Sequence, residues 1–521
     1  MAGLLALSPR IGDIAQMSDE TMWRITARTP DGEVLSGREE QVAGQPRLHF
    51  AVPRGPRFAF VIDSAQPVPV VEEAPPALVA APTPPPVAVV PKLQAHHLPE
   101  AAVIKALAEG GHEEILRTHF GEAYEDLRDT VKGIAARAKG KKRRRVLVLP
   151  GVMSSLIGEP KGSSNHVKWL DPAEIIAGNL FHLSYDAKPL VGTSVSSMLP
   201  CYLPLKLRLQ LADHDVDIVH YDWRHRVEDL GAELAKKIVA DRSAKVTLVV
   251  HSMGGLVARS ALKQSAAANA KVDLVVQLGT PNLGAPALAQ AVRGSYPLLQ
   301  TVLKLDPRHT ADDYGNLVAS FPGMYALLPP HGAPFGIALR DLGIWPTSGV
   351  QPKAEFLSGC GKSQDDLLAP DARFFLVAGA NLDTVTNVRK EGDDFLYDYS
   401  MGGDGTVPVT SAQMPGLTQA WFADGIVHDH LCMSPTTCDA AASILDGNSP
   451  KLPTTFKAKK DGITKTETDA SLKKPGTIAK IEGDARHVFE AVHAAAAKVS
   501  GGAETLHGTL KKAGSWLKKH L

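Results

Sequence analysis

The residues best suited to chemistry surround one serine. They form the run Val246-Thr247-Leu248-Val249-Val250-His251-Ser252-Met253-Gly254-Gly255. The apolar, β-branched stretch before the serine predicts a strand, and the stretch after the glycine pair predicts an amphipathic helix. A serine on so sharp a turn has an exposed hydroxyl, as a nucleophile requires. The usual pattern is G-x-S-x-G, and Val250 stands where the first glycine is usual. Ser252 is therefore the candidate nucleophile.

A nucleophilic serine needs a base and an acid that orients the base. Asp404 is the candidate acid, because flanking glycines predict a tight turn after an apolar run and before a histidine. The base is expected in the loop before the last helix of the core, where His428 and His430 both occur. We favour His428, because two variable residues, a leucine and a short polar stretch commonly follow such a histidine. His430 remains the alternative base, and Asp429 is expected to be only a neighbour.

Backbone N–H groups must stabilise the oxyanion that forms during acyl transfer. One donor is expected from Met253, directly after the nucleophile. The second is expected from the loop after the first core strand, where Gly151 lets the backbone turn across the serine. We predict the Val152 N–H as this donor, with Met153 as the alternative. The expected chemistry needs no metal and no organic cofactor, and we expect His251 to have no catalytic role.

Alternating strands and helices are predicted to position these residues. Apolar runs and amphipathic segments alternate from residue 146 to about 445, which predicts a doubly wound α/β core with a mostly parallel sheet. The strands are expected at 146–149, 216–219, 246–250, 274–278 and 374–378, with helices at 227–240 and 255–268. The alternation stops between residues 284 and 370, where 287–305 is expected to be helical. That insertion is either a cap over the site or a peripheral embellishment.

The rest of the chain divides by composition. We expect a small β module at 1–63, a Pro-rich linker at 64–99, a helical segment with a basic run at 100–145, the core at 146–449 and a Lys-rich tail at 450–521. The tail is expected to be disordered to about residue 482 and then helical. Its last residues, 506–521, form a basic amphipathic segment that either contacts an anionic membrane or docks on the protein itself.

Composition limits the partners. The chain has 521 residues, with 56 Lys and Arg balanced by 56 Asp and Glu, so its net charge gives no sign of a nucleic-acid partner. No uncharged apolar stretch approaches the length of a transmembrane helix, and the N-terminal residues lack the features of a secretory signal. We therefore expect a cytoplasmic protein, peripheral to a membrane if the tail binds one. The four cysteines are expected to be free thiols, with a Cys432–Cys438 disulfide as the alternative.

Several ordered blocks together resemble the lecithin:cholesterol acyltransferase family of lipases and acyltransferases. The resemblance covers about residues 146–445 and rests on Pro150-Gly151-Val152-Met153-Ser154-Ser155, Lys168-Trp169-Leu170-Asp171-Pro172, Tyr221-Asp222-Trp223-Arg224, His251-Ser252-Met253-Gly254-Gly255, Leu278-Gly279-Thr280-Pro281-Asn282-Leu283-Gly284-Ala285-Pro286, Ser320-Phe321-Pro322-Gly323-Met324-Tyr325-Ala326-Leu327-Leu328-Pro329 and Gly403-Asp404-Gly405-Thr406-Val407-Pro408.

The resemblance implies an α/β-hydrolase fold with a cap, a Ser252-Asp404-His428 triad, and cleavage or transfer of lipid acyl chains. It also implies that Trp169, Trp223 and Arg224 support the acyl-binding side. Judged as plain residues, the last two could equally be core packing and a structural ion pair. The expected function is a serine-dependent lipid acyl hydrolase or O-acyltransferase that works through an acyl-Ser252 intermediate on a lipid or ester substrate. The alternative is a non-catalytic scaffold whose terminal segments bind a partner or a membrane.

Overall fold

A computed structural model describes residues 97–137, 143–161, 164–306, 308–360 and 367–473, together with the backbone of four N-terminal strands. The chain divides into two compact units, residues 1–88 and 89–521. The first unit holds an antiparallel sheet in the order β3-β2-β1-β4, made of β1 (Trp23–Arg28), β2 (Val34–Val42), β3 (Gln45–Phe50) and β4 (Val61–Pro67). Most of the Pro-rich linker, much of the basic run and the amphipathic segment 506–521 lie outside the described residues.

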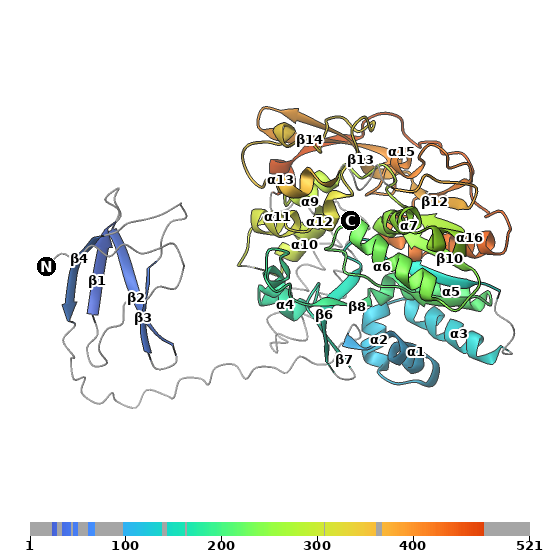
Figure 1. Cartoon of the computed structure of the whole chain (residues 1–521), viewed down its shortest axis with the longest axis horizontal. Helices are drawn as coiled ribbons and strands as arrows, with labels where there is room; N and C mark the ends of the chain where they lie inside the picture. The colour runs from blue at the N-terminus through green and yellow to red at the C-terminus, as the bar shows by residue number, and fades with distance from the viewer. Residues whose placement is uncertain are drawn as a thin grey trace, which may run out of the picture. The chain divides into compact units, whose positions relative to one another are not determined.

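The second unit is built on a six-stranded parallel sheet (Figure 1). Its order is β15-β12-β11-β10-β5-β9, and each neighbouring pair is parallel. The strands are β5 (Arg145–Leu149), β9 (Asp215–Ile218), β10 (Val246–His251), β11 (Val272–Leu278), β12 (Phe374–Ala380) and β15 (Ala420–Asp424). Five of these match the predicted runs. The sixth, β15, was not predicted; it is only five residues long and contains no β-branched residue.

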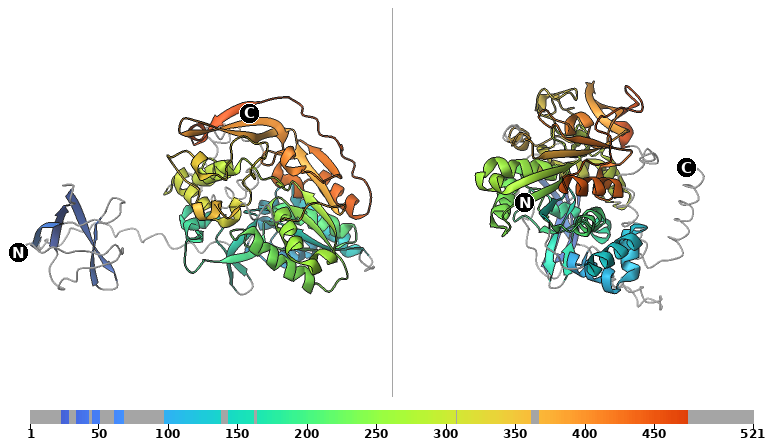
Figure 2. Two further views of the ribbon diagram at one scale, coloured as in Figure 1. Left: turned by 45° about the horizontal axis from the view of Figure 1, so that its top comes forward. Right: turned by 90° about the vertical axis from the view of Figure 1, so that its right-hand side faces the viewer.

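Helices cover both faces of this sheet, because successive side chains of a strand point to opposite faces. Leu147 and Leu149 pack into one apolar cluster with α6 (Val227–Ala240), α7 (Met253–Gln264) and α8 (Ala266–Lys271). Val146 and Val148 pack into the other with α5 (Leu199–Leu211) and α16 (Pro435–Leu445). The two views of Figure 2 show these helices on either side of the strands. The predicted doubly wound core is thus confirmed.

Three helices precede the core and pack on α5. They are α1 (Glu100–Glu109), α2 (Glu113–Phe120) and α3 (Ala123–Ala136). Their buried apolar residues form one cluster with Leu199, Leu203 and Leu207 of α5. This layer stabilises α5, which carries a tyrosine of the site described below.

The insertion after β11 is helical but broken into short pieces. It contains α9 (Leu288–Val292), α10 (Pro297–Leu303), α11 (Ala311–Ala319), α12 (Pro322–Tyr325), η3 (Leu342–Ile344) and α13 (Ala354–Leu357). The continuous helix expected over 287–305 is therefore corrected to two. Gly294 breaks it with a φ of 73°, and Pro297 then starts α10.

Two small antiparallel sheets complete the unit. One has the order β7-β6-β8, made of β6 (Ser155–Lys161), β7 (Ser164–Val167) and β8 (Thr193–Ser197). The other has the order β13-β14-β16, made of β13 (Leu382–Glu391), β14 (Asp394–Gly403) and β16 (Lys465–Thr468). The remaining elements are α4 (Pro172–Ile176), η2 (Asn179–Leu183), α15 (Val409–Ala412), η4 (His428–Cys432) and α17 (Asp469–Leu472).

The first part of the tail is ordered, which corrects the expectation of disorder from residue 450. β16 pairs with β14, and α17 follows it. The buried Asp469 anchors this segment through Arg293 Nε, Ser295 Oγ and the Tyr397 hydroxyl, each at 2.7 Å from a carboxylate oxygen. This segment has no apolar pattern in its sequence. It is held instead by pairing of β16 with the edge strand β14 and by the buried Asp469–Arg293 ion pair. The predicted helix at 484–500 lies outside the described residues.

Within the described part of the chain, no helix is both long and apolar enough to cross a lipid bilayer. The same residues contain no group of three His, Cys, Asp or Glu side chains that could hold a metal ion. All four cysteines are free thiols.

Candidate active site

Ser252 lies at the sharp turn between β10 and α7, with φ of 51° and ψ of −128°. An L-residue adopts this conformation only at a cost of about 1–3 kcal/mol, and such strain is concentrated at functional sites. The Ser252 N–H donates to the Leu278 carbonyl at 3.0 Å, which holds the turn on the sheet. Gly254 is required here because a Cβ would lie 2.7 Å from the Pro150 carbonyl oxygen. Val250, at the unusual position, is fully buried in β10.

Asp404 and His428 form a buried pair at the same edge of the sheet. His428 Nδ1 lies 2.8 Å from Asp404 Oδ2, and both side chains are almost fully buried. The other carboxylate oxygen of Asp404 accepts from the N–H groups of Thr406 at 3.1 Å and Val407 at 2.7 Å. The turn after β14 thus holds the carboxylate, and the carboxylate orients the ring. Since Nδ1 donates to Asp404, Nε2 is the ring nitrogen left to act as a base.

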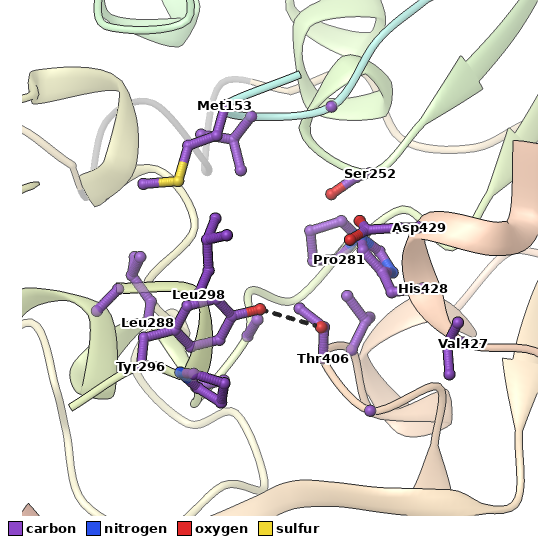
Figure 3. A pocket seen from close by; sticks show the side chains of 18 of the residues that line it. Met153, Ser252, Pro281, Leu288, Tyr296, Leu298, Thr406, Val427, His428 and Asp429 are labelled. Carbon is purple, nitrogen blue, oxygen red and sulfur yellow. Dashed lines mark hydrogen bonds between the residues drawn. The ribbon is translucent and has the colours of Figure 1, made fainter. Parts of the chain in front are cut away.

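Ser252 and His428 open into one cavity of about 630 Å³. Figure 3 shows both residues on one side of it and the insertion residues Leu288 and Leu298 on the other. β13, β14 and β16 supply a further wall, which includes Tyr399. The insertion therefore lines the cavity that holds the serine, which favours the cap over the peripheral embellishment.

His430 also lines the cavity, but the ring 2.8 Å from Asp404 Oδ2 is that of His428. Both histidines lie on the 3-10 helix η4, where residues two apart point in different directions. Only one ring can therefore face the carboxylate, and it is that of His428.

The loop after β5 crosses the serine closely. A Cβ on Gly151 would lie 2.9 Å from Ser252 Cβ, so only glycine lets this backbone approach. None of the described residues accepts a hydrogen bond from the Val152 or Met253 N–H. The Met253 N–H is the first of α7, where the helix itself offers no acceptor. The Val152 and Met253 N–H groups, predicted as oxyanion donors, thus have no acceptor among the described residues.

Four aromatic side chains bond to the backbone of this loop. Trp169 Nε1 donates to the Met153 carbonyl at 2.9 Å, and Trp223 Nε1 donates to the Ser155 carbonyl at 2.9 Å. The Tyr221 hydroxyl donates to the Pro150 carbonyl at 2.6 Å, and the Tyr202 hydroxyl accepts from the Gly151 N–H at 2.9 Å. The aromatic side chains therefore hold the loop that presents the Val152 N–H.

The three residues expected to support the acyl-binding side do not themselves line the cavity that holds Ser252. Trp169 and Trp223 are buried against each other, with ring centroids 4.9 Å apart. Arg224 is fully buried and binds both carboxylate oxygens of Asp222, at 2.9 and 2.6 Å. Trp223 therefore packs in the core and Arg224 forms a structural ion pair, as these residues considered without the family resemblance also suggested.

Replacing Trp169 with phenylalanine keeps an aromatic ring but removes the donor to Met153. We expect kcat for ester hydrolysis to fall about 10-fold with little change in KM, because a loosened loop would misplace the Val152 N–H that is predicted to bind the oxyanion. Steady-state kinetics on a short p-nitrophenyl ester would measure this. Phe181→Leu is a matched control, since Phe181 packs against the same apolar cluster as Trp169 but makes no hydrogen bond to the loop. An unchanged kcat would show that the indole bond does not position the loop.

His251 connects this loop to the loop of the candidate base. Its Nε2 lies 3.0 Å from the His428 carbonyl and must donate to it, so Nδ1 accepts from the Tyr202 hydroxyl at 2.8 Å. The Tyr202 oxygen in turn accepts from Gly151. Burial lowers the pKa of His251 well below its ordinary value, and nearby His428 lowers it further. A neutral His251 with the proton on Nε2 therefore links the two loops.

This neutral histidine predicts a loss of stability in acid. Below its ordinary pKa of about 6.5, His251 takes up a proton in the unfolded chain but not in the folded one, so unfolding is favoured as pH falls. We expect this effect to cost about 2 kcal/mol of unfolding free energy at pH 5. The drop in Tm between pH 7.5 and pH 5 should therefore be smaller in His251→Gln than in the wild type. Equal drops would show that His251 titrates normally in the folded protein.

Sequence reasoning missed Tyr202 and the wall formed by β13, β14 and β16. Tyr202 lies within an apolar helix, where nothing in the sequence distinguishes a bonded hydroxyl from ordinary packing. It also treated His251 as a locally packed residue, whereas the structure gives it two specific partners.

Comparison with known proteins agrees with this architecture. The family described as PGAP1-like alpha/beta domain matches residues 234–317, the segment that contains α7 and Ser252. The parallel sheet, its helices on both faces and the strained serine after a central strand are those of one fold. The chain has an α/β-hydrolase fold. No curated protein is significantly similar to it in sequence.

Several solved structures share parts of this architecture at low identity. The Tle4–Tli4 complex matches at 13% identity over 58% of this chain and 98% of that chain, with a TM-score of 0.37. Mature Bacillus licheniformis lipase BlEst2 matches at 14% identity over 59% of this chain and 94% of the lipase chain, with a TM-score of 0.33. Aspergillus fumigatus lipase B matches at 11% identity over 70% of this chain and 64% of the lipase chain, with a TM-score of 0.30.

Proposed function

We propose that this protein is a serine-dependent acyl hydrolase or O-acyltransferase that acts on lipid esters through an acyl-Ser252 intermediate. The observation that carries the proposal is the strained backbone of Ser252, in the same cavity as His428, whose ring is paired with Asp404. A folded protein holds a serine in this conformation only if the surrounding structure enforces it. A non-catalytic scaffold has no need of the strain or of the buried pair.

Acylation would begin when His428 Nε2 takes the proton of the Ser252 hydroxyl and the serine oxygen attacks the ester carbonyl carbon. The carbonyl oxygen becomes an oxyanion, which accepts hydrogen bonds from the Val152 and Met253 N–H groups. Asp404 stabilises the imidazolium. The intermediate then collapses: the bond from carbon to the alcohol oxygen breaks, and His428 gives its proton to that oxygen.

Deacylation would repeat these steps with a second acceptor. Water, or an alcohol for acyl transfer, gives a proton to His428 Nε2 while its oxygen attacks the acyl carbon. The bond to Ser252 breaks, and the serine oxygen regains the proton from His428. The free acid or a new ester leaves, and no metal or organic cofactor takes part.

The walls of the cavity support a lipid acyl chain as the substrate group. Apolar side chains of the insertion line the same cavity as the serine, among them Ala287, Leu288, Leu298, Met324 and Leu327. Transfer of an acyl chain from water to such a surface is favourable by about 0.8 kcal/mol for each buried CH₂ group. The resemblance to the lecithin:cholesterol acyltransferase family agrees with this substrate class.

A fluorophosphonate probe tests the proposal directly, because it phosphonylates only an activated serine. We expect one label per chain, located on the peptide with Ser252 by mass spectrometry, together with hydrolysis of p-nitrophenyl esters. A folded protein that neither reacts with the probe nor hydrolyses such esters would favour the scaffold instead. A label on another serine would place the nucleophile elsewhere.

A further inference from the structure

A second carboxyl group lies in the cavity beside the candidate base. Asp429 directly follows His428 on η4, is only partly exposed and lines the same cavity as Ser252. Figure 3 shows its carboxyl group on the side of the cavity occupied by Ser252 and His428, across from Leu288 and Leu298. It makes no hydrogen bond or ion pair with any residue that the structure describes.

In this respect the partly exposed Asp429 differs from the buried aspartates of the protein. Every fully buried aspartate in the described residues bonds to at least two groups: Asp171, Asp222, Asp306, Asp398, Asp404 and Asp469. Burial raises the pKa of Asp429, the nearby His428 opposes this shift and the charge of Asp404 adds to it. An unfavourable carboxyl retained in a cavity is a candidate for ligand binding.

The position of Asp429 relates it to one part of the substrate. If the proposed function holds, the oxyanion faces the Val152 and Met253 N–H groups, and the acyl chain lies on the apolar wall of the insertion. The alcohol oxygen must lie near His428 Nε2, from which it receives its proton. Asp429, the next residue on the cavity side, therefore faces the alcohol portion of the ester.

The charge of His428 during catalysis decides which alcohols fit. An unpaired carboxylate could bind either a cationic group or a hydroxyl group. A fixed cation beside His428 would disfavour the imidazolium that both acylation and deacylation require, whereas a neutral hydroxyl would not. We infer that the Asp429 carboxylate accepts a hydrogen bond from a free hydroxyl on the alcohol portion of the substrate, which makes polyol esters such as monoacylglycerols the preferred class.

Matched esters test this inference. The substrates are a monoacylglycerol, the methyl ester and the choline ester of one short fatty acid, compared by kcat/KM. The variants are Asp429→Leu, which has a similar shape but no acceptor, and Asp429→Asn, which keeps a neutral acceptor. Asp383→Asn is the matched control, because Asp383 also lines the cavity but lies on β13 and accepts from Thr464.

We expect the wild type to prefer the monoacylglycerol over the methyl ester. Asp429→Leu should lower kcat/KM for the monoacylglycerol by about 30-fold and Asp429→Asn by less, because hydrogen bonds to charged acceptors are the stronger ones. Both variants should hydrolyse the methyl ester within about 3-fold of the wild type. The control should retain the wild-type preference.

Stability provides an independent check that the variants fold. Because the pKa of Asp429 is raised in the folded state, its charge destabilises the fold at neutral pH, and this cost disappears as pH falls toward the unfolded value. Asp429→Asn should therefore raise Tm at pH 7 and have little effect near pH 4. If Asp429→Asn has a higher Tm but a weaker preference for the monoacylglycerol, the loss of preference comes from lost ligand recognition and not from impaired folding.

Three outcomes would overturn the inference. An unchanged monoacylglycerol preference in Asp429→Leu would show that the carboxyl does not bind the alcohol. Equal losses on both neutral esters would assign Asp429 to positioning His428. A wild-type preference for the choline ester that the variants lose would indicate a cation site. In each case Ser252-dependent methyl ester hydrolysis would leave the proposed function intact, while its absence would remove the function as well.

Discussion

Ester hydrolysis by the Ser252→Ala variant is expected to fall by about 10⁶-fold in kcat, with no change in fold. The variant loses the oxygen that attacks the carbonyl, and a residual rate over water would come only from the oxyanion donors and substrate binding. Alanine at this position still has to adopt a φ near 51°, so the strain of the turn remains and Tm should change little. Progress curves with a p-nitrophenyl ester would measure the rate, and circular dichroism would check the fold.

The matched control for this variant is Ser260→Ala, a buried serine on the same helix α7 that lies outside the cavity. It should keep wild-type kinetics and probe labelling. If Ser252→Ala retained more than a few per cent of the activity, the nucleophile would not be Ser252 and the proposed mechanism would fail.

His428→Ala is expected to have an effect of similar size, about 10⁵- to 10⁶-fold in kcat, because nucleophile and base act as one unit. His430→Ala removes the neighbouring ring and leaves the His428–Asp404 pair intact, so it should change kcat by less than about 10-fold. The rate of fluorophosphonate labelling should fall with His428→Ala and not with His430→Ala, since both probe and substrate need an activated hydroxyl. The reverse order would make His430 the base.

A combined variant sharpens this comparison. Because Ser252 and His428 are expected to cooperate in one proton transfer, the loss in Ser252→Ala/His428→Ala should be about equal to that in either single variant. Additive losses would show that the histidine contributes to catalysis independently of the serine.

The site could be predicted from sequence where it depends on local structure. The strand, the turn and the helix around Ser252 are adjacent in the chain, so apolar periodicity and a glycine pair were enough to indicate the turn. The same holds for Asp404, whose carboxylate accepts from N–H groups two and three residues later. The parallel core was predictable for the same reason, because strands buried on both faces are continuous apolar runs.

The choice between His428 and His430 needed the tertiary structure. Both residues have the right type, spacing and order, and the direction of each ring depends on the turn of η4 and on where β14 ends. The two tryptophans show the same limit. An indole N–H can bond to any carbonyl, so nothing in the sequence indicated that these two would bond to the carbonyls of Met153 and Ser155.

Contacts between segments distant in the chain were decided only by folding. The Gly151–Tyr202–His251–His428 chain of hydrogen bonds joins four segments, and no local pattern in the sequence indicates that Tyr202 or His251 takes part in it. β16 has no apolar pattern because its order comes from pairing with the edge of β14 and from the buried Asp469. The sequence by itself thus determined the parallel core and the turn that carries Ser252, since both follow from local periodicity. The cavity, the ring that meets Asp404 and the unpartnered Asp429 follow from long-range packing, which local patterns do not encode.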